Sequence, residues 1–270
     1  MLDHYLSVII LSIIQGITEF VPVSSSGHLV ILHNLLPEIK INKLAFDVFL
    51  HVGTLLAVIV FFWSDLVKIF IDWLKNSLKF KFKAPEARLG WLLIIATVPA
   101  AILGYIFEDL IETSLRSNLV VAIMLIVVGV LFLLVEYYSK QQHKLIKLNW
   151  KNVLFIGVAQ AIALIPGTSR SGITIIAGMA SKLKREEALK FSFLMSVPII
   201  LGANIKKIPV ISTAILDGNL FSFVMSLVIS FFTAYFVIKY LLIYVKNNSL
   251  NIFAYYRFVL AIIILLLYFI

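Results

Sequence analysis

Two stretches of the chain share a pattern that decides its fold: residues 15–28 read QGITEFVPVSSSGH, and residues 160–173 read QAIALIPGTSRSGI. Each stretch lies inside a longer apolar segment, 5–36 or 152–181, and interrupts it with proline, glycine and serine. Neither apolar half is long enough to cross a bilayer alone, because a spanning helix needs about 20 apolar residues. Each segment is therefore expected to form a helical hairpin that enters the membrane and returns to the same side.

The composition of the whole chain agrees with a membrane protein. Of its 270 residues, 61% are hydrophobic and only 14% are charged, whereas a soluble domain has roughly 45–50% apolar and 25% charged residues. A soluble enzyme and a disordered chain are both excluded by this composition. The formal net charge of +9 is typical of cytoplasmic loops that contact anionic lipid. The chain has no cysteine, so disulfides and thiolate chemistry are excluded.

Six further apolar segments are long enough to span a membrane. The predicted fold is a single all-α integral-membrane domain, residues 1–270, with six transmembrane helices and two re-entrant helical hairpins in an inverted-topology repeat. The six predicted spans are residues 45–63, 89–107, 118–137, 188–204, 220–243 and 252–270.

The repeat is indicated by matching polar residues in the two broken segments. These residues recur 145 positions later in the chain: Gln15 as Gln160, Ser24 as Ser169, Ser26 as Ser171, and Gly27 as Gly172. The two halves of the repeat are predicted at about 1–137 and 152–270. A competing match, of residues 97–99 with residues 196–198, leaves the pairing of the spans between the halves open.

The distribution of basic residues predicts the orientation in the membrane. The loops at 64–88, 138–151, 182–187 and 244–251 hold 14 lysines and arginines, and the opposite loops hold five, namely Lys40, Lys43, Arg116, Lys206 and Lys207. Because cytoplasmic loops carry the excess of basic residues, the first group is predicted to be cytoplasmic. The first hairpin then enters from outside and the second from the cytoplasm, so that their polar breaks meet near the midplane. The basic run from Lys75 to Lys83 is expected to touch anionic lipid and not nucleic acid.

Three ionisable side chains lie within the apolar frame of the two hairpins: Glu19, His28 and Arg170. A charge at the bilayer centre costs about 2.5–3.5 kcal/mol, so such residues are candidates for function by default. Serines at the breaks are expected to cap two helix N-termini, and helix N-termini together with an arginine form a site for phosphate. Carboxylate and imidazole groups add acid–base or nucleophilic chemistry. The residues together indicate phosphoryl chemistry.

Three motifs in order carry a resemblance to a known family. Residues 15–19 match an (E/Q)xxxE motif, residues 22–28 resemble a PVSS(T/S)GH segment, and residues 166–174 match PGxSRSGxT. These are the motifs of the undecaprenyl-pyrophosphate phosphatases, the UppP/BacA family, and the resemblance extends through nearly the whole chain. A lone (E/Q)xxxE motif would be a weak signal, whereas three motifs at the expected separation are highly specific.

The resemblance implies an enzyme that removes the terminal phosphate of undecaprenyl pyrophosphate, recycles this lipid carrier for cell-wall synthesis and confers bacitracin resistance. It implies a multi-pass protein of the bacterial inner membrane whose site faces the extracytoplasmic side. It also implies a divalent cation, Mg²⁺ or Ca²⁺, and a homodimer. The expected partners are the lipid substrate and membrane lipids, with no nucleic acid. The alternative function is a carrier or flippase for polyprenyl phosphate, because inverted hairpins with a central arginine also suit transport.

The roles assigned within this candidate site are hypotheses. Arg170 would clamp the pyrophosphate, and Glu19 would ligate the cation or act as a base. The nucleophile, or the group that activates it, would be His28 or Ser25, and the sequence leaves the choice open. Gln15 is the candidate second metal ligand, although an amide is a weaker ligand than a carboxylate and cannot act as a base. The expected phosphate-binding residues are Ser24, Ser26, Gly27, Ser169, Ser171, Gly172 and Thr174. Asp47 and His51 begin a predicted span at helical spacing. They are interpreted as interface anchors, with a position facing the cavity as the alternative.

Overall fold

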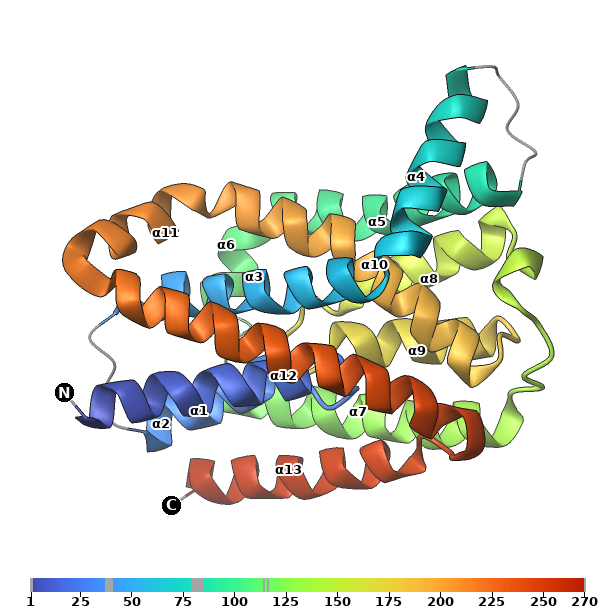
Figure 1. Ribbon diagram of the computed structural model, residues 1–270. Helices are drawn as coiled ribbons and strands as arrows, with labels where there is room; N and C mark the ends of the chain where they lie inside the picture. Colours follow the sequence, from blue (N-terminus) through green and yellow to red (C-terminus); the bar gives the residue numbers. More distant parts are fainter. Residues whose placement is uncertain (1, 37–40, 79–84, 114, 116, 270) are drawn as a thin grey trace.

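The structure is a computed structural model that describes residues 2–36, 41–78, 85–113, 115 and 117–269. It is a bundle of helices (Figure 1). In chain order these are α1 (Leu2–Thr18), α2 (Ser25–Leu35), α3 (Lys43–Phe61), α4 (Trp63–Leu78), α5 (Pro85–Ile106), α6 (Glu108–Thr113), α7 (Asn118–Tyr138), α8 (Trp150–Ile162), α9 (Arg170–Ala180), α10 (Arg185–Lys206), α11 (Ile208–Ala214), α12 (Leu220–Asn247) and α13 (Asn251–Phe269). A 3₁₀ turn, η1 (Leu145–Lys147), precedes α8, and a π-helical turn, η2 (Ile215–Asn219), joins α11 to α12.

Five of the six predicted spans are confirmed as helices long and apolar enough to cross a membrane. They are Lys43–Phe61, Arg88–Ile106, Asn118–Tyr138, Arg185–Lys206 and Leu220–Asn247. The sixth predicted span forms α13, whose apolar stretch Asn251–Leu267 is shorter than these five; its last residue, Ile270, lies outside the described residues. The all-α class and the polytopic membrane protein are therefore confirmed.

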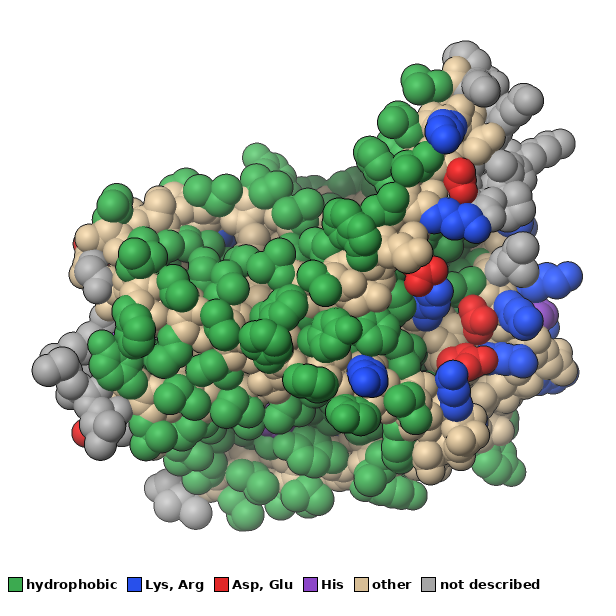
Figure 2. All heavy atoms as spheres, viewed as in Figure 1, with side chains coloured by type: hydrophobic (Ala, Val, Ile, Leu, Met, Phe, Trp, Pro, Cys, Tyr) green, Lys and Arg blue, Asp and Glu red, His purple; other side chains and the backbone are tan. Residues whose placement is uncertain are grey.

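The surface of the bundle is apolar along its length and charged at one end. Figure 2 shows hydrophobic side chains over most of the visible face, with lysine, arginine and carboxylate groups gathered near the end where α7 joins α8. Large apolar side chains such as Phe232, Tyr240 and Ile262 are about half exposed. Such a surface indicates contact with lipid, because exposing an apolar area of this extent to water is unfavourable.

Both broken segments form helical hairpins. In the first, α1 packs against α2, and in the second, α8 packs against α9. The breaks lie at residues 19–24 and 163–169. Figure 1 shows α1 entering the bundle from the end near the N-terminus and α8 entering from the opposite end. The breaks consequently meet inside the bundle.

The helices that follow the two breaks begin in the same way. Ser24 and Ser169 are the N-caps of α2 and α9, with φ of 76° and 71°. Each cap hydroxyl accepts a hydrogen bond from a backbone N–H three residues later, Gly27 N at 3.3 Å and Gly172 N at 3.1 Å. Left-handed backbone is uncommon for a residue with a side chain and persists only where the surroundings enforce it. The predicted correspondence of the two breaks is therefore present in their conformation.

Hydrogen bonds and an ion pair join the loops and helix ends at the charged end of the bundle. The Glu136 carboxylate at the end of α7 accepts from the Arg185 guanidinium at the start of α10, with Nε–Oε1 at 2.9 Å, and from Leu250 N between α12 and α13 at 2.8 Å. Gln142 N and His143 N both donate to Lys182 O. The loops predicted to be cytoplasmic between these helices therefore lie at the same end.

Several loop predictions need correction. Residues 64–88 were expected to be a loop, but most of α4 and the first turn of α5 lie there, because α4 packs on α5 through the edge-to-face contact of Trp73 with Trp91. The predicted loop 244–251 is shorter than expected, since α12 continues to Asn247. The basic residues Lys40, Lys79, Lys81, Lys83 and Arg116 lie outside the described residues.

Candidate active site

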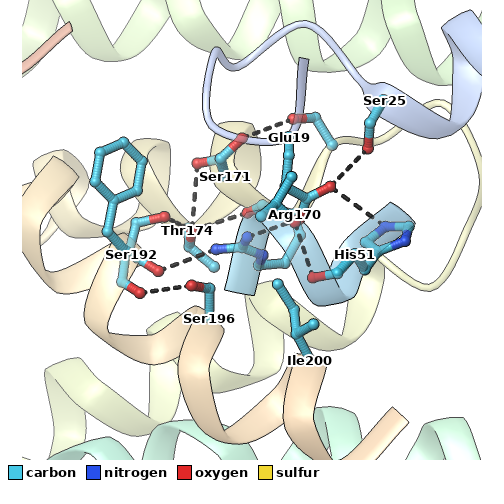
Figure 3. Close-up of polar contacts among 12 residues, drawn as sticks. Glu19, Ser25, His51, Arg170, Ser171, Thr174, Ser192, Ser196 and Ile200 are labelled. Atoms are coloured by element: carbon cyan, nitrogen blue, oxygen red, sulfur yellow. Dashed lines mark hydrogen bonds and ion pairs between the residues drawn. The ribbon is translucent and has the colours of Figure 1, made fainter. Parts of the chain in front are cut away.

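The Glu19 carboxylate lies at the centre of the candidate site (Figure 3). Glu19 follows the last residue of α1, and its backbone N–H continues the helix by donating to Gln15 O at 3.0 Å. The residue is buried, with 7% of its surface exposed. A buried carboxylate has to be compensated by hydrogen bonds or opposite charge, and the residues that provide this compensation define the site.

The four partners of Glu19 come from α1, α2, α3 and α9. Arg170 Nη2 donates to Oε1 at 2.9 Å. Ser25 Oγ and Gln15 Nε2 each donate to Oε2 at 3.0 Å, and His51 Nε2 lies 3.3 Å from the same atom. The chain thus brings Gln15, Glu19, Ser25 and Arg170 together, as expected from the sequence.

Arg170 is held in place by α10 as well as by Glu19. It is the first residue of α9, and its Nη1 donates to Ser192 O at 3.0 Å. The hydroxyls of Thr174 and Ser192 lie 2.7 Å apart, and Thr174 Oγ1 also donates to Arg170 O. Ser192 was not a predicted site residue, because nothing in the local sequence shows that α10 passes beside α9.

Ser25 and Arg170 occupy equivalent positions in the two hairpins. Each is the first helical residue after a serine N-cap, at the N-terminus of α2 and of α9. Both side chains reach Glu19. The same local turn therefore presents a hydroxyl from one half of the chain and a guanidinium from the other to a single carboxylate.

His28 is engaged by other groups. Its Nδ1 lies 2.7 Å from Ser24 O, and its Nε2 lies 2.7 Å from the hydroxyl of Tyr256 in α13, with the two rings stacked. Because a carbonyl oxygen only accepts, Nδ1 donates to it, and in the neutral ring Nε2 accepts from Tyr256. Both ring nitrogens of His28 are thus used in holding the backbone of the first break against α13.

His51 was missed as a site residue. It was interpreted as an interface anchor, but its ring lies beside Glu19, and its Nδ1 is 2.8 Å from Asp47 O one turn earlier in α3. The Asp47 carboxylate instead contacts His33 of α2, at 2.8 Å. An ionisable residue within an apolar span is the signal that identifies His51.

The predicted phosphate-binding serines serve largely as internal caps. Beyond the cap bonds already described, the second serine of each motif lies 3.2 Å from the cap hydroxyl, in the pairs Ser24–Ser26 and Ser169–Ser171. Ser26 Oγ also accepts from Gly167 N at 3.3 Å, which joins the two breaks. These hydroxyls therefore shape the two helix N-termini.

A cavity of about 240 Å³ adjoins the polar cluster. Glu19, His51 and Arg170 line one part of it, and apolar residues of α5 and α10, such as Ala100 and Ile200, line another. A polar pocket with apolar walls suits a phosphate group attached to a hydrocarbon chain.

The residues present fit a divalent cation only in part. No group of three or more His, Cys, Asp or Glu side chains within the described ranges is placed to hold a metal ion. Gln15 uses its Nε2 to contact Glu19, and its buried Oε1 has no hydrogen-bond partner among the residues that the structure describes. One carboxylate and one free amide oxygen suit a Mg²⁺ ion whose other ligands are substrate phosphate oxygens and water.

Comparison with known proteins gives one consistent result. The family model described as "Bacitracin resistance protein BacA" matches residues 8–263. Two similar proteins are the undecaprenyl-diphosphatase of Caldicellulosiruptor bescii, 43% identical over 96% of both chains, and that of Rubrobacter xylanophilus, 42% identical over 95% of both. The undecaprenyl-diphosphatase of Methanosphaera stadtmanae is 40% identical over 99% of both chains. The chain belongs to the bacitracin resistance protein BacA family.

Proposed function

We propose that this protein is an integral-membrane phosphatase that hydrolyses undecaprenyl pyrophosphate to undecaprenyl phosphate and inorganic phosphate. The activity in the names of its relatives supports this proposal. The observation that carries it is the contact of Glu19 with both Ser25 and Arg170. Phosphoryl transfer to serine requires a hydroxyl as nucleophile, a base to accept its proton and a cation to stabilise charge. Ser25, Glu19 and Arg170 supply these three groups, and the carboxylate contacts the other two directly.

The proposed first step is attack of Ser25 Oγ on the terminal phosphorus atom. The Ser25 proton passes to Glu19 Oε2, to which the hydroxyl already donates. The new bond joins Oγ to phosphorus, and the bond from phosphorus to the bridging oxygen breaks, with its electron pair leaving on undecaprenyl phosphate. Arg170 stabilises the charge on the transferring group. Water then attacks the phosphorus atom of the phosphoserine, and the bond from phosphorus to Oγ breaks. Glu19 returns its proton to Oγ, and both protons of the water leave with the released phosphate.

His28 is the less suitable nucleophile of the two residues that the sequence left open. Its ring nitrogens contact Ser24 O and the Tyr256 hydroxyl, so attack by His28 would require both contacts to be released. Ser25 already donates to a carboxylate that can accept its proton, which favours serine as the nucleophile.

A divalent cation is part of the proposal. Glu19 and the free Oε1 of Gln15 would hold it, together with phosphate oxygens of the substrate. When bound, it would neutralise charge on the pyrophosphate.

The proposed topology is an inverted repeat with two re-entrant hairpins in the cytoplasmic membrane of a bacterium. The entry of α1 and α8 from opposite ends of the bundle supports it. With the charged end in the cytoplasm, the first hairpin enters from outside, and we propose that the site opens to the extracytoplasmic side. A homodimer also belongs to this proposal, and light scattering in detergent measures it.

Phosphate release from undecaprenyl pyrophosphate by the purified chain in detergent tests the function. Cation-dependent release is the expected result. Binding of the lipid without release would contradict the phosphatase and favour a polyprenyl phosphate carrier, because a carrier needs the Arg170 cation but no nucleophile.

A further inference from the structure

Arg257, in the middle of α13, is a fully buried arginine with an unusual set of partners. Its side chain has 0% exposure, although it is one of the largest in the protein. Its guanidinium lies within hydrogen-bond distance of five backbone carbonyl oxygens, those of Pro22, Met124, Leu125, Gly167 and Thr168, at 2.8–3.3 Å. The two N–H groups of Nη2 are shared among three of these oxygens. One side chain thereby joins α7, the first break and the second break.

The chemistry of arginine explains this arrangement. A guanidinium is planar and directs five N–H donors outward in a fixed fork, whereas lysine has a single ammonium group on a flexible chain. Burial of a cation is unfavourable unless hydrogen bonds compensate for the lost water. Five carbonyl oxygens provide this compensation, and two of the three segments that supply them are the breaks at the candidate site.

At the second break, Arg257 fixes the peptide groups that lead into α9. Nη2 lies 2.8 Å from Gly167 O and 3.0 Å from Thr168 O. In a trans peptide the N–H points opposite to the carbonyl, so the N–H of Ser169 points away from Arg257. Ser169 is the left-handed N-cap of α9, and Arg170 follows it. Arg257 therefore orients the backbone from which the phosphate clamp projects.

At the first break, two consecutive residues of α13 hold the backbone that leads into α2. Arg257 Nη1 donates to Pro22 O at 3.3 Å. The Tyr256 hydroxyl contacts His28, whose Nδ1 donates to Ser24 O. Ser24 is the N-cap directly before Ser25. The position of both hairpin caps relative to each other thus depends on α13.

We propose that Arg257 is a positioning residue that sets Ser25 and Arg170 at the separation needed for phosphoryl transfer. It does so from behind the two breaks, through backbone carbonyls, and not by touching the substrate. This inference rests on the phosphatase function proposed above. A nucleophile and a phosphate clamp on two separate hairpins require such a link, because a displacement of about 1 Å in reacting groups can reduce the rate on the order of 10²-fold.

The first experiment measures kcat and KM of Arg257→Lys with undecaprenyl pyrophosphate, using full-length chain that elutes as a single species in detergent. Lysine keeps the charge but cannot bridge both breaks. We expect kcat to fall on the order of 10²-fold, and KM to rise by a smaller factor, because the groups that bind the lipid remain and only their alignment changes. Arg257→Gln, which removes the buried charge, is the second variant should the lysine protein not fold.

Arg185→Lys is the matched control. Arg185 also uses a guanidinium to fasten connections, by pairing with Glu136 at the charged end of the bundle. The same substitution there is expected to lower the unfolding temperature and to leave kcat unchanged. A loss of kcat in Arg257→Lys that exceeds the loss in Arg185→Lys at equal unfolding temperature supports a positioning role.

A double-variant comparison separates positioning from general stability. If Arg257 acts by aligning Arg170, the fold decrease in kcat caused by Arg257→Lys is smaller in the Arg170→Lys background than in the wild-type background. Equal fold losses in the two backgrounds, or wild-type kcat in Arg257→Lys, would overturn the inference while leaving the phosphatase intact. Absence of phosphate release by the wild-type chain would instead overturn the proposed function, and the inference with it.

Discussion

Side chains from α1, α2, α3 and α9 converge on the Glu19 carboxylate, and their chemistry decides which substitutions are informative. Glu19→Gln would leave the partly buried Arg170 without its anionic partner, and breaking a pair of this kind costs up to about 3–5 kcal/mol of stability when both groups are fully buried. Loss of activity in that variant could then result from unfolding as well as from the loss of the catalytic carboxylate. Ser25 and Arg170 allow cleaner tests.

Replacement of Ser25 by alanine is expected to abolish turnover, by at least about 10³-fold, because a missing nucleophile removes the covalent path. The fold should persist, since Ser25 is not the N-cap of α2. Steady-state phosphate release measures the effect. Ser212→Ala, an exposed serine of α11 that bonds only locally to Pro209 O, is the control. Near wild-type turnover by Ser25→Ala would transfer the nucleophile's role to His28.

Replacement of Arg170 by lysine keeps the charge but removes the fork that reaches Glu19 and Ser192 O together. Removal of one donor that stabilises a transition state typically costs about 10²–10³-fold in kcat, and we expect a loss of this size. The measurement is kcat for phosphate release at saturating lipid. Activity within a few-fold of wild type would show that a point charge suffices. The simultaneous contact with Glu19 and Ser192 O would then not be required.

At the scale of the elements, the two breaks are the part of the fold with the tightest backbone requirements. Gly167 in the second break has φ of +91°, and a Cβ added to it would lie 2.5 Å from Val121 O in α7. A residue with a side chain is disfavoured there both by its backbone conformation and by this contact. The glycine therefore allows the break to approach α7 and the carbonyls beside it to reach Arg257.

Gly167→Ala is expected to destabilise the fold by more than about 1–2 kcal/mol, the cost of left-handed backbone for an L-residue, because the steric contact adds to it. Thermal unfolding in detergent measures the change. Gly202→Ala is the control, since no atom of the described part of the chain lies within 4 Å of its added Cβ in α10, and alanine favours a helix by up to about 1 kcal/mol. Equal unfolding temperatures for the two variants would contradict the close approach.

The element that sequence reasoning missed most clearly is α4. Residues 64–88 lie between two predicted spans and were predicted to be a cytoplasmic loop. The structure forms α4 there, with no buried residue. Side chains such as Phe70 and Leu78 are more than half exposed. Figure 1 shows α4 projecting from the bundle at an angle. At 16 residues, α4 is shorter than the roughly 20 apolar residues that a spanning helix needs, so a search for membrane spans does not find it.

At the scale of the whole molecule, the two ends of the bundle are held by different ion pairs. Glu136 and Arg185 fasten the charged end. At the opposite end, Glu108 beyond α5 pairs with Lys206 and with Lys207, the latter at 2.9 Å. Two of the five basic residues counted on that side are thus matched by a carboxylate, which strengthens the charge asymmetry from which the orientation was predicted.

Hydrogen bonds from Lys206 and Lys207 hold the pKa of Glu108 below its ordinary value. A lowered pKa in the folded state stabilises the protein above the unfolded pKa of about 4.3, and this stabilisation is lost as the pH falls through the folded pKa. Glu108→Gln should therefore lower the unfolding temperature at neutral pH, by a free energy of no more than about 1 kcal/mol for such an exposed pair. The difference from wild type should vanish in acid. A difference that is constant from neutral to acidic pH would contradict the assignment.

The sequence by itself determined the class of protein, the two hairpins, five long spans, and the candidate residues Glu19, Ser25 and Arg170. Short segments of sequence encode these features. The length of an apolar run, a proline or glycine break and a short motif can each be recognised within a few helical turns. The family motifs added the activity. The charge count predicts an orientation, because the excess of lysine and arginine in cytoplasmic loops can be counted from the sequence alone.

Only the tertiary structure decided which of these residues meet. Glu19 and Arg170 are 151 residues apart, and Arg257 contacts Pro22 across 235 residues. No local pattern assigns a partner at such separation, so His51 was mistaken for an interface anchor and Arg257 was not a candidate at all. In the bilayer a buried polar group must find its partner within the protein, because no water is available. The packing of α3, α9 and α13 supplies those partners, and with them the geometry of the site.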